Sequence, residues 1–394
     1  MAVGDKIVVG MLVIAGLAWW QQDNLKKQIE NGLDAVTYLP KDPFAKMIDS
    51  GFCKNLIDSH EYHDTESLSA PQLLEMSQKL ENIALNTPGI TNSEGASASF
   101  SSYHRIIVSS NGFEGTCKKS SFSCGISVIA GQNEHMKTDY DYDTALFKSD
   151  LRPLEDIASR AAKRALDKLN SLTIKTGSMP VIFERRAGKE VFRSFFAAIN
   201  GRNISEKTSF LKDDINSLVF PKNITIIDTP LLARGVASRP FDDEGIIGGN
   251  LEIIKNGILQ SWILDYICGL KLELKSTGHS SRNISGPSSP KITNIHFEGN
   301  FDSRENILAD IPFGFYITEL MGGGGNTVTG DFSSGASGFL IENGHLTTPI
   351  HEATIAGNLK DMFSSMILAN DFEKKGGLDS PTFMVPNFDK IICS

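Results

Sequence analysis

Residues 322–358, GGGGNTVTGDFSSGASGFLIENGHLTTPIHEATIAGN, hold a glycine run, a hairpin signal and a helix start. Asn343 and Gly344 separate an apolar run at 338–341 from a mixed run at 345–350. Asn-Gly between two such runs predicts a β-hairpin, because both central residues of a type I′ turn need positive φ. The glycines at 322–325 leave backbone amides uncovered and permit close approach by another chain. The stretch could therefore form a catalytic site, a ligand cradle or an architectural joint.

The composition of the chain is that of a globular protein. Its 394 residues favour two domains, and 40% hydrophobic with 22% charged residues is sufficient for a sizeable core. The formal net charge is −9 and no cluster of lysine and arginine is present. Because phosphate backbones repel such a chain, we do not expect a nucleic-acid partner.

The cysteines indicate a reducing compartment. There are five of them, at irregular spacing and without a CxxC motif, which is typical of free thiols in the cytoplasm. Cys117 and Cys124 could face each other across a turn, although two small strand residues is the simpler interpretation. We therefore expect a cytoplasmic protein.

Residues 1–23 form an atypical apolar N-terminus. Residues 7–20 are fourteen apolar positions after Lys6. As a helix they would span about 21 Å at ~1.5 Å per residue, which is short of a ~30 Å bilayer core. Three interpretations stay open: a membrane tether, a buried segment, or the product of a disrupted reading frame.

The periodicity of apolar residues predicts an α+β protein with two different halves. In the first half it predicts long helices and an antiparallel hairpin with a further strand, at 24–38, 69–85, 154–172, 103–117 and 121–130. After a linker at 176–180 and a helix near 189–199, short apolar runs alternate with glycine turns, which is typical of a sandwich or barrel. A helix at 358–368 and a strand at 381–385 close the pattern. We place the N-terminal α+β domain at 24–176 and the β-rich domain at 177–394.

The common catalytic motifs are incomplete in this chain. Ser337 lies in GASGF (335–339), which misses the GxSxG nucleophile motif by one position. No Walker loop is present, and 322–328 does not continue as GxGxxG. His351-Glu352 begins a zincin motif without a second histidine, whereas His60 and His63 could bind metal only with a third ligand.

Two loops gather polar side chains that could bind a peptide backbone or a carboxylate. One is STGHSSRNISGP (276–287), with a histidine, an arginine and many hydroxyls. The other is RPFDDEG (239–245), with an arginine and three carboxylates. Well-hydrogen-bonded or ion-paired loops are the alternative interpretation for both.

Several motifs in order along the chain together resemble the TldD/PmbA family, and in particular its PmbA, or TldE, branch. The resemblance extends from about residue 24 to the C-terminus. The motifs are ITNSEGA (90–96), SFLKD (209–213), SRPFD (238–242), EG (244–245), STGH (276–279), TGDFSSGA (329–336), FLIENG (339–344) and TIAGNLKDMF (354–363).

The resemblance implies a two-subunit intracellular protease that degrades or trims peptides. Its TldD-like subunit carries zinc on a helix with the motif HExxxH and on a later cysteine, and its PmbA-like subunit lacks these ligands. Here the corresponding segments, 184–192 and 375–380, contain no histidine and no cysteine. The resemblance thus implies no catalytic residue and no metal in this chain, with zinc in a TldD-like partner. The family's first strands are missing before residue 24, so we expect an incomplete first domain.

We therefore expect a non-catalytic subunit that is inactive alone and that pairs with a TldD-like subunit to handle peptides or unfolded proteins. A homo-oligomer is possible. The alternatives are a repurposed peptide-binding protein, tethered to a membrane through residues 7–20, and an independent metalloenzyme that uses His60 and His63. The expected residues of the peptide or partner interface are Ser276, Thr277, Gly278, His279, Arg282, Arg239, Asp242, Glu244, Thr329, Gly330, Asp331, Ser333, Glu342, Asn343 and Gly344.

Overall fold

A computed structural model of the chain describes residues 22–44, 46, 48, 60–173, 176–283, 287–373 and 375–393. The apolar segment 7–20 lies outside these residues. No helix in the described part is long and apolar enough to cross a membrane. The predicted helix at 24–38 is present as α1 (Gln22–Thr37), which exposes Leu25 and Ile29.

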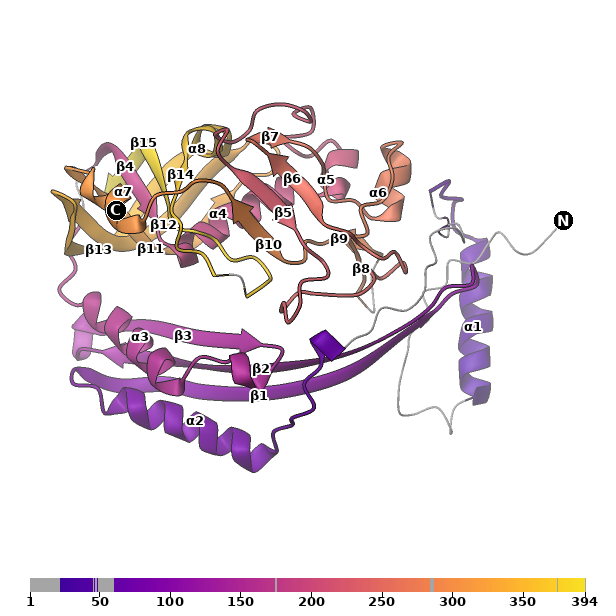
Figure 1. Cartoon of the computed structure of the whole chain (residues 1–394), viewed down its shortest axis with the longest axis horizontal. Helices are drawn as coiled ribbons and strands as arrows, with labels where there is room; N and C mark the ends of the chain where they lie inside the picture. The colour runs from indigo at the N-terminus through magenta and orange to yellow at the C-terminus, as the bar shows by residue number, and fades with distance from the viewer. Residues whose placement is uncertain are drawn as a thin grey trace.

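An antiparallel sheet with the strand order β1-β2-β3 forms the first half, and α2 and α3 cover one of its faces (Figure 1). The predicted helix at 69–85 is present as α2, which begins after a capping box made by Ser69 and Gln72. The helix α3 ends at Asp167, five residues before the predicted end. The elements are η3 (His60–Tyr62), α2 (Ala70–Leu85), β1 (Ile90–Val108), β2 (Glu114–Ala130), η4 (Asn133–His135), β3 (Lys137–Ala145), η5 (Lys148–Asp150) and α3 (Leu154–Asp167).

The hairpin is longer than its sequence predicts. The run at 121–130 is not a separate strand, because β2 continues from Glu114 to Ala130 without a break. Cys124 packs in the core beneath α2 and α3. Cys117 packs with Phe113 of the first half and with Phe241 of the second half. Residues an odd number apart on a strand point to opposite faces, so Cys117 and Cys124 do not face each other across a turn.

A six-stranded sheet with the order β13-β12-β11-β4-β15-β14 organises the described part of the second half. Additional pairing between β13 and β15 closes it into a barrel-like sheet, in agreement with the predicted fold class. The predicted strand at 181–183 is present and starts earlier, because residues 177–180 of the expected linker also belong to β4, where Val181 pairs with Phe315 and with Val385. The strands are β4 (Gly177–Phe183), β11 (Phe313–Gly325), β12 (Asp331–Glu342), β13 (His345–Asn358), β14 (Ile367–Leu368) and β15 (Phe383–Cys393).

A smaller antiparallel sheet with the order β10-β5-β6-β7 lies beside the barrel-like sheet. Helices and one two-stranded ribbon complete the second half. These elements are α4 (Arg185–Ala198), α5 (Gly201–Ser205), β5 (Thr225–Asp228), β6 (Leu251–Lys255), β7 (Ile258–Leu259), α6 (Tyr266–Lys271), β8 (Ser280–Ser281), β9 (Ser289–Pro290), β10 (Ile295–Glu298), α7 (Arg304–Ala309) and α8 (Leu359–Ser365).

The predicted Asn-Gly hairpin is confirmed. It joins β12 to β13, and Asn343 and Gly344 have φ angles of 51° and 78°. Gly338 is required for a different reason, because a Cβ there would lie 1.8 Å from the carbonyl oxygen of Tyr316 on β11. The strand β13 extends through the predicted helix start to Asn358, which caps α8 through its side chain.

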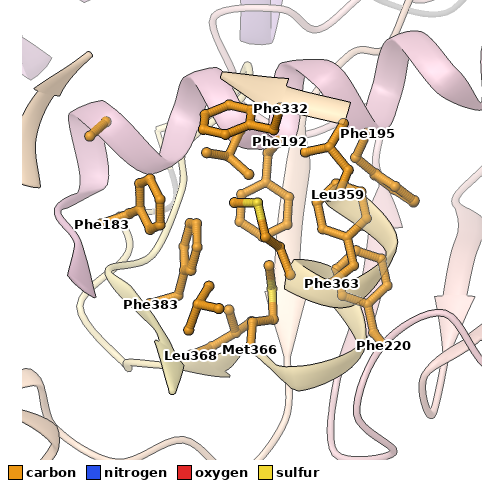
Figure 2. Close-up of a cluster of buried hydrophobic side chains, with 14 of the residues drawn as sticks. Phe183, Phe192, Phe195, Phe220, Phe332, Leu359, Phe363, Met366, Leu368 and Phe383 are labelled. Atoms are coloured by element: carbon orange, nitrogen blue, oxygen red, sulfur yellow. The ribbon is translucent and has the colours of Figure 1, made fainter. Parts of the chain in front are cut away.

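Phenylalanine rings fill the core where α4 and α8 pack on the barrel-like sheet (Figure 2). Phe192 on α4 is fully buried, and its ring meets those of Phe220, Phe297 and Phe383 at centroid distances of 4.8–6.3 Å. Because these rings come from four distant segments, the core fixes α4 relative to both sheets.

Replacing Phe192 by alanine should lower the free energy of unfolding by about 3–5 kcal/mol, since it removes buried surface and leaves a cavity. Urea unfolding followed by circular dichroism measures the change. Val328→Ala is the control, because Val328 is 57% exposed and should change stability by less than about 0.5 kcal/mol. Equal effects of the two substitutions would contradict this account of the core.

Candidate functional site

The two polar loops predicted from the sequence form one interlocked network. One carboxylate oxygen of Asp242 accepts the backbone N–H of Ile246, and the other accepts that of Ser280 at 3.0 Å. Arg239 donates to the Ser280 carbonyl at 2.7 Å, and the Arg282 backbone N–H bonds to Asp243. These bonds hold the loops to each other and leave their charges largely enclosed.

A buried histidine and aspartate complete this network. His279 Nε2 lies 3.3 Å from Asp228 Oδ2, both side chains are 0% exposed, and Nδ1 lies 2.9 Å from the Thr277 hydroxyl. Burial raises the pKa of Asp228, but the hydrogen bond and charge of His279 hold that pKa below its ordinary value. Ser276 and Gly278 bond within the same loop. We conclude that these residues position the loops.

Glu244 is a further buried carboxyl of the network. Burial, with the nearby charge of Asp242, raises the pKa of Glu244 to about 8. Its Oε2 accepts the backbone N–H of Tyr266 at 2.9 Å, at the start of α6. The carboxyl therefore has a partner within the fold.

The other predicted site residues lie at two turns. Thr329 donates to Asp331 at 2.7 Å in the turn before β12, where Gly330 has a φ of 81°, and Ser333 follows on β12. Glu342, Asn343 and Gly344 form the turn after β12. Among the described residues, no hydrogen bond joins either turn to the network around Asp242.

Neither histidine arrangement forms a metal or nucleophile site. His63 Nε2 lies 3.1 Å from Ser102 Oγ, and the described residues contain no group of three or more metal-ligating side chains. Ser337 Oγ lies 3.1 Å from His351 Nδ1, and His351 Nε2 lies 3.2 Å from Glu352. Ser337 is only 1% exposed, so this arrangement joins β12 to β13 and presents no nucleophile to solvent.

The two segments at which the family resemblance places zinc ligands meet at one cavity. It has a volume of about 250 Å³ and lies between α3 and β3 of the first half and α4 of the second. We call it the charged cavity. Its lining residues are Asp141, Tyr142, Asp143, Thr144, Arg152, Arg160, Arg164, Glu184, Arg185, Arg186, Lys189, Val236, Glu373, Lys375, Gly376, Leu378 and Asp379.

The side chains of the charged cavity do not fit zinc. The lining contains neither histidine nor cysteine. When the pattern HExxxH is placed from Glu184, Lys189 stands at the second histidine position, and a protonated amine has no lone pair for a metal. The carboxylates are occupied as well, because Glu373 and Asp379 bond to Arg185 at 2.8 and 2.9 Å.

Ion pairs across this cavity join the two halves of the chain. Asp139 on β3 is 2% exposed and lies 2.6 Å from Arg186 of α4 and 2.9 Å from Lys168. Lys168 also binds Glu319 of β11 at 2.6 Å. Burial raises the pKa of Asp139, but the hydrogen bond and charge of Arg186, with Lys168, hold that pKa below its ordinary value. The carboxylate is therefore ionised at neutral pH.

A second cavity, of about 360 Å³, lies further along α4, toward its C-terminal end. Its wall includes the glycines at 322–325, together with Glu190, Arg193 and Ser194 of α4. We call residues 319–325 the glycine edge. The strand β11 pairs with β4 only from Phe315 to Ile317, and beyond that point no described strand pairs with this side of β11. The backbone at 321–324 is exposed.

Comparison with known proteins gives the family. The PmbA/TldA metallopeptidase central domain matches residues 63–169, and the PmbA/TldA metallopeptidase C-terminal domain matches residues 176–390. The chain belongs to the PmbA/TldD metallopeptidase family. It is 34% identical to the metalloprotease PmbA of Escherichia coli O157:H7, over 92% of this chain and 79% of that protein. It is 31% identical to the PmbA homologue of Haemophilus influenzae, with the same coverage.

Solved structures share the fold. A protein from Bacteroides thetaiotaomicron, described as a modulator of DNA gyrase, matches with a TM-score of 0.84 at 27% identity, covering 94% of this chain and 83% of that one. TldE from Thermococcus kodakarensis matches with a TM-score of 0.76 at 20% identity, covering 94% and 85%. The second likeness supports the fold alone.

The cations at the start of α4 are functional candidates that the sequence analysis did not predict. Residues 184–192 stand out there only for their missing histidines, although the segment also contains Arg185, Arg186 and Lys189. A signal was present, because three cations in the first turns of a helix oppose the helix dipole and need compensating anions. Those anions, Asp139, Glu373 and Asp379, are distant in sequence.

Replacing Asp139 by asparagine should lower the free energy of unfolding by about 3–5 kcal/mol at pH 7, because Lys168 and Arg186 lose a buried partner. The folded pKa of Asp139 is depressed, so its contribution is present above the unfolded pKa and is lost as the pH falls through the folded value. The difference between wild type and variant should stay constant from about pH 8 to 5 and shrink below about pH 4.

Urea unfolding at a series of pH values measures this difference. Asp213→Asn is the matched control, because the Asp213 side chain is 86% exposed and should matter little at any pH. A difference that grows on acidification would contradict the assigned role of Asp139.

Proposed function

We propose that this chain is a PmbA/TldE-like non-catalytic subunit of a two-subunit zinc protease that processes peptides and unfolded proteins. The observation that carries the proposal is the charged cavity, in which Lys189 and Lys375 stand in segments where the resemblance places zinc ligands. Zinc and the catalytic groups then belong to a TldD-like partner. The described cysteines Cys117, Cys124 and Cys268 are free thiols, which supports a cytoplasmic location.

The glycine edge could bind the backbone of a peptide whatever the peptide's sequence. An extended peptide can add as a strand to an unpaired edge, where main-chain hydrogen bonds provide the affinity. Glycines help because they have no side chains to block the approach. Gly322, Gly323 and Gly324 have positive φ angles of 62°, 70° and 137°, conformations that glycine adopts without strain. We infer that the edge holds substrate backbones.

The isolated chain should bind much less than one zinc ion per molecule and should not cleave an unfolded peptide. Adding the TldD-like protein from the same genome should give cleavage that a chelator stops. Mass spectrometry of the metal content and a fluorogenic peptide assay measure both. Chelator-sensitive cleavage by the isolated chain would refute the proposed role.

A peptide-binding protein without a protease partner is the second candidate. It is favoured by the glycine edge, whose exposed backbone lies at the second cavity. Co-purification of the tagged chain with a TldD-like protein would support the first candidate, and recovery of peptides without that protein would support the second.

Strand addition predicts that binding depends on alternate amides of the peptide. In a β-ladder each residue in turn directs its N–H toward or away from its neighbour, so N-methylation should matter at every second position. Two versions of one six-residue peptide, methylated at odd or at even amides, should differ in affinity by about tenfold or more. Fluorescence anisotropy measures this, and equal affinities would exclude strand addition.

A further inference from the structure

We propose that the charged cavity binds the C-terminal carboxylate of a peptide held on the glycine edge. This inference rests on the proposed function and deepens it. It sets the direction in which a peptide lies along the glycine edge, and it requires the substrate to have a free C-terminal carboxylate. Two observations support it: the charge balance of the cavity and its position beside α4.

The cavity carries an excess of positive charge in a chain that is acidic. Seven basic and five acidic side chains line it, whereas the formal net charge of the chain is −9. The carboxylates that face the cavity are already paired: Asp141 with Arg152, Asp143 with Lys375, Glu184 with Arg164, and Glu373 and Asp379 with Arg185. Asp139, which does not line the cavity, balances Arg186, so a smaller excess of positive charge remains uncompensated.

Two cations supply most of that excess. Arg160 lies 3.7 Å from Asp141, a carboxylate that Arg152 already holds at 2.9 Å. Lys189 has no carboxylate of the described residues within 4.0 Å. In addition, Arg185 Nε is buried without a hydrogen-bond partner in the described structure. A carboxylate bound here would gain charge-assisted hydrogen bonds, which are stronger than neutral ones.

The glycine edge leads toward this cavity. Arg186 at the start of α4 donates to the Thr318 carbonyl at 3.3 Å, and a Cβ on Gly325 would lie 2.8 Å from Ser194 later in α4. The strand and the helix thus run alongside each other. A peptide lying along residues 319–325 would pass the irregular turn of backbone at residues 322–324 and would have one end beside Arg186.

The charge of the cavity determines which end of the peptide lies beside Arg186. A peptide antiparallel to the glycine edge places its C-terminus near Glu319 and its carboxylate toward Lys189. The opposite direction would place an ammonium group against an excess of cations, which costs free energy. Glu319 itself is neutralised by Lys168 at 2.6 Å and leaves room for the carboxylate's charge. We therefore expect antiparallel addition.

The test compares two N-acetylated peptides of one sequence, one with a free C-terminal carboxylate and one with a C-terminal amide. On the full chain, fluorescence anisotropy at low salt should show about tenfold tighter binding of the free acid. Because the interaction is ionic, the preference should weaken as salt rises. Lys189→Gln should reduce the preference, and so should Arg160→Gln, whereas Lys212→Gln is a control on the exposed surface.

The outcomes separate this inference from the proposed function. Equal binding of acid and amide, or tighter binding of the amide, overturns carboxylate recognition and leaves peptide binding intact. Failure of both peptides to bind overturns peptide binding and, with it, the inference. A preference that survives both Lys189→Gln and Arg160→Gln places the carboxylate elsewhere and also overturns the assignment.

Discussion

The ion pairing of Asp139 with Lys168 and Arg186 is the constraint on which the arrangement of the two halves depends. A carboxylate that is 2% exposed and touches two cations cannot lose either one without leaving charge in a poorly solvated place. Lys168 follows α3 and Arg186 lies in the first turn of α4, so this carboxylate ties the sheet of the first half to the barrel-like second half. The two cavities that follow each other along α4 then have defined walls.

The first turn of α4 has a sequence that is unfavourable for a helix N-terminus, and the fold compensates for it. Cations in the first turn of a helix oppose its dipole by about 0.3–1 kcal/mol each. Here the Glu184 side chain caps the helix, while Arg185 binds Glu373 and Asp379, and Arg186 binds Asp139. The compensating anions come from β3 and from the segment before β15. The helix therefore depends on tertiary contacts at the same place where the charged cavity forms.

Local signals account for what could be predicted from the sequence. The Asn343-Gly344 hairpin and the apolar stripes of α2 and α3 are each encoded within a few residues, and the sequence predicts each of them. The linker at 176–180 was misread because β4 acquires its strand character from pairing with β11 and β15, which lie more than a hundred residues away. The same limit applies to the site. The residues of 239–244 and 276–282 were expected to bind a ligand, and the structure shows them bonded mainly to one another.

Binding a peptide backbone and binding a metal ion place different physical requirements on a site. Holding a peptide backbone needs an open strand edge and small side chains, and both are properties of β11 that tolerate changes elsewhere. Metal binding needs several ligands placed to within tenths of an ångström, and the two segments where the resemblance places those ligands contain neither histidine nor cysteine. A chain that lacks the ligands can therefore keep the edge. At the two histidine positions of the pattern stand Glu184, which is paired with Arg164, and Lys189, and the charged cavity and the glycine edge both lie along α4.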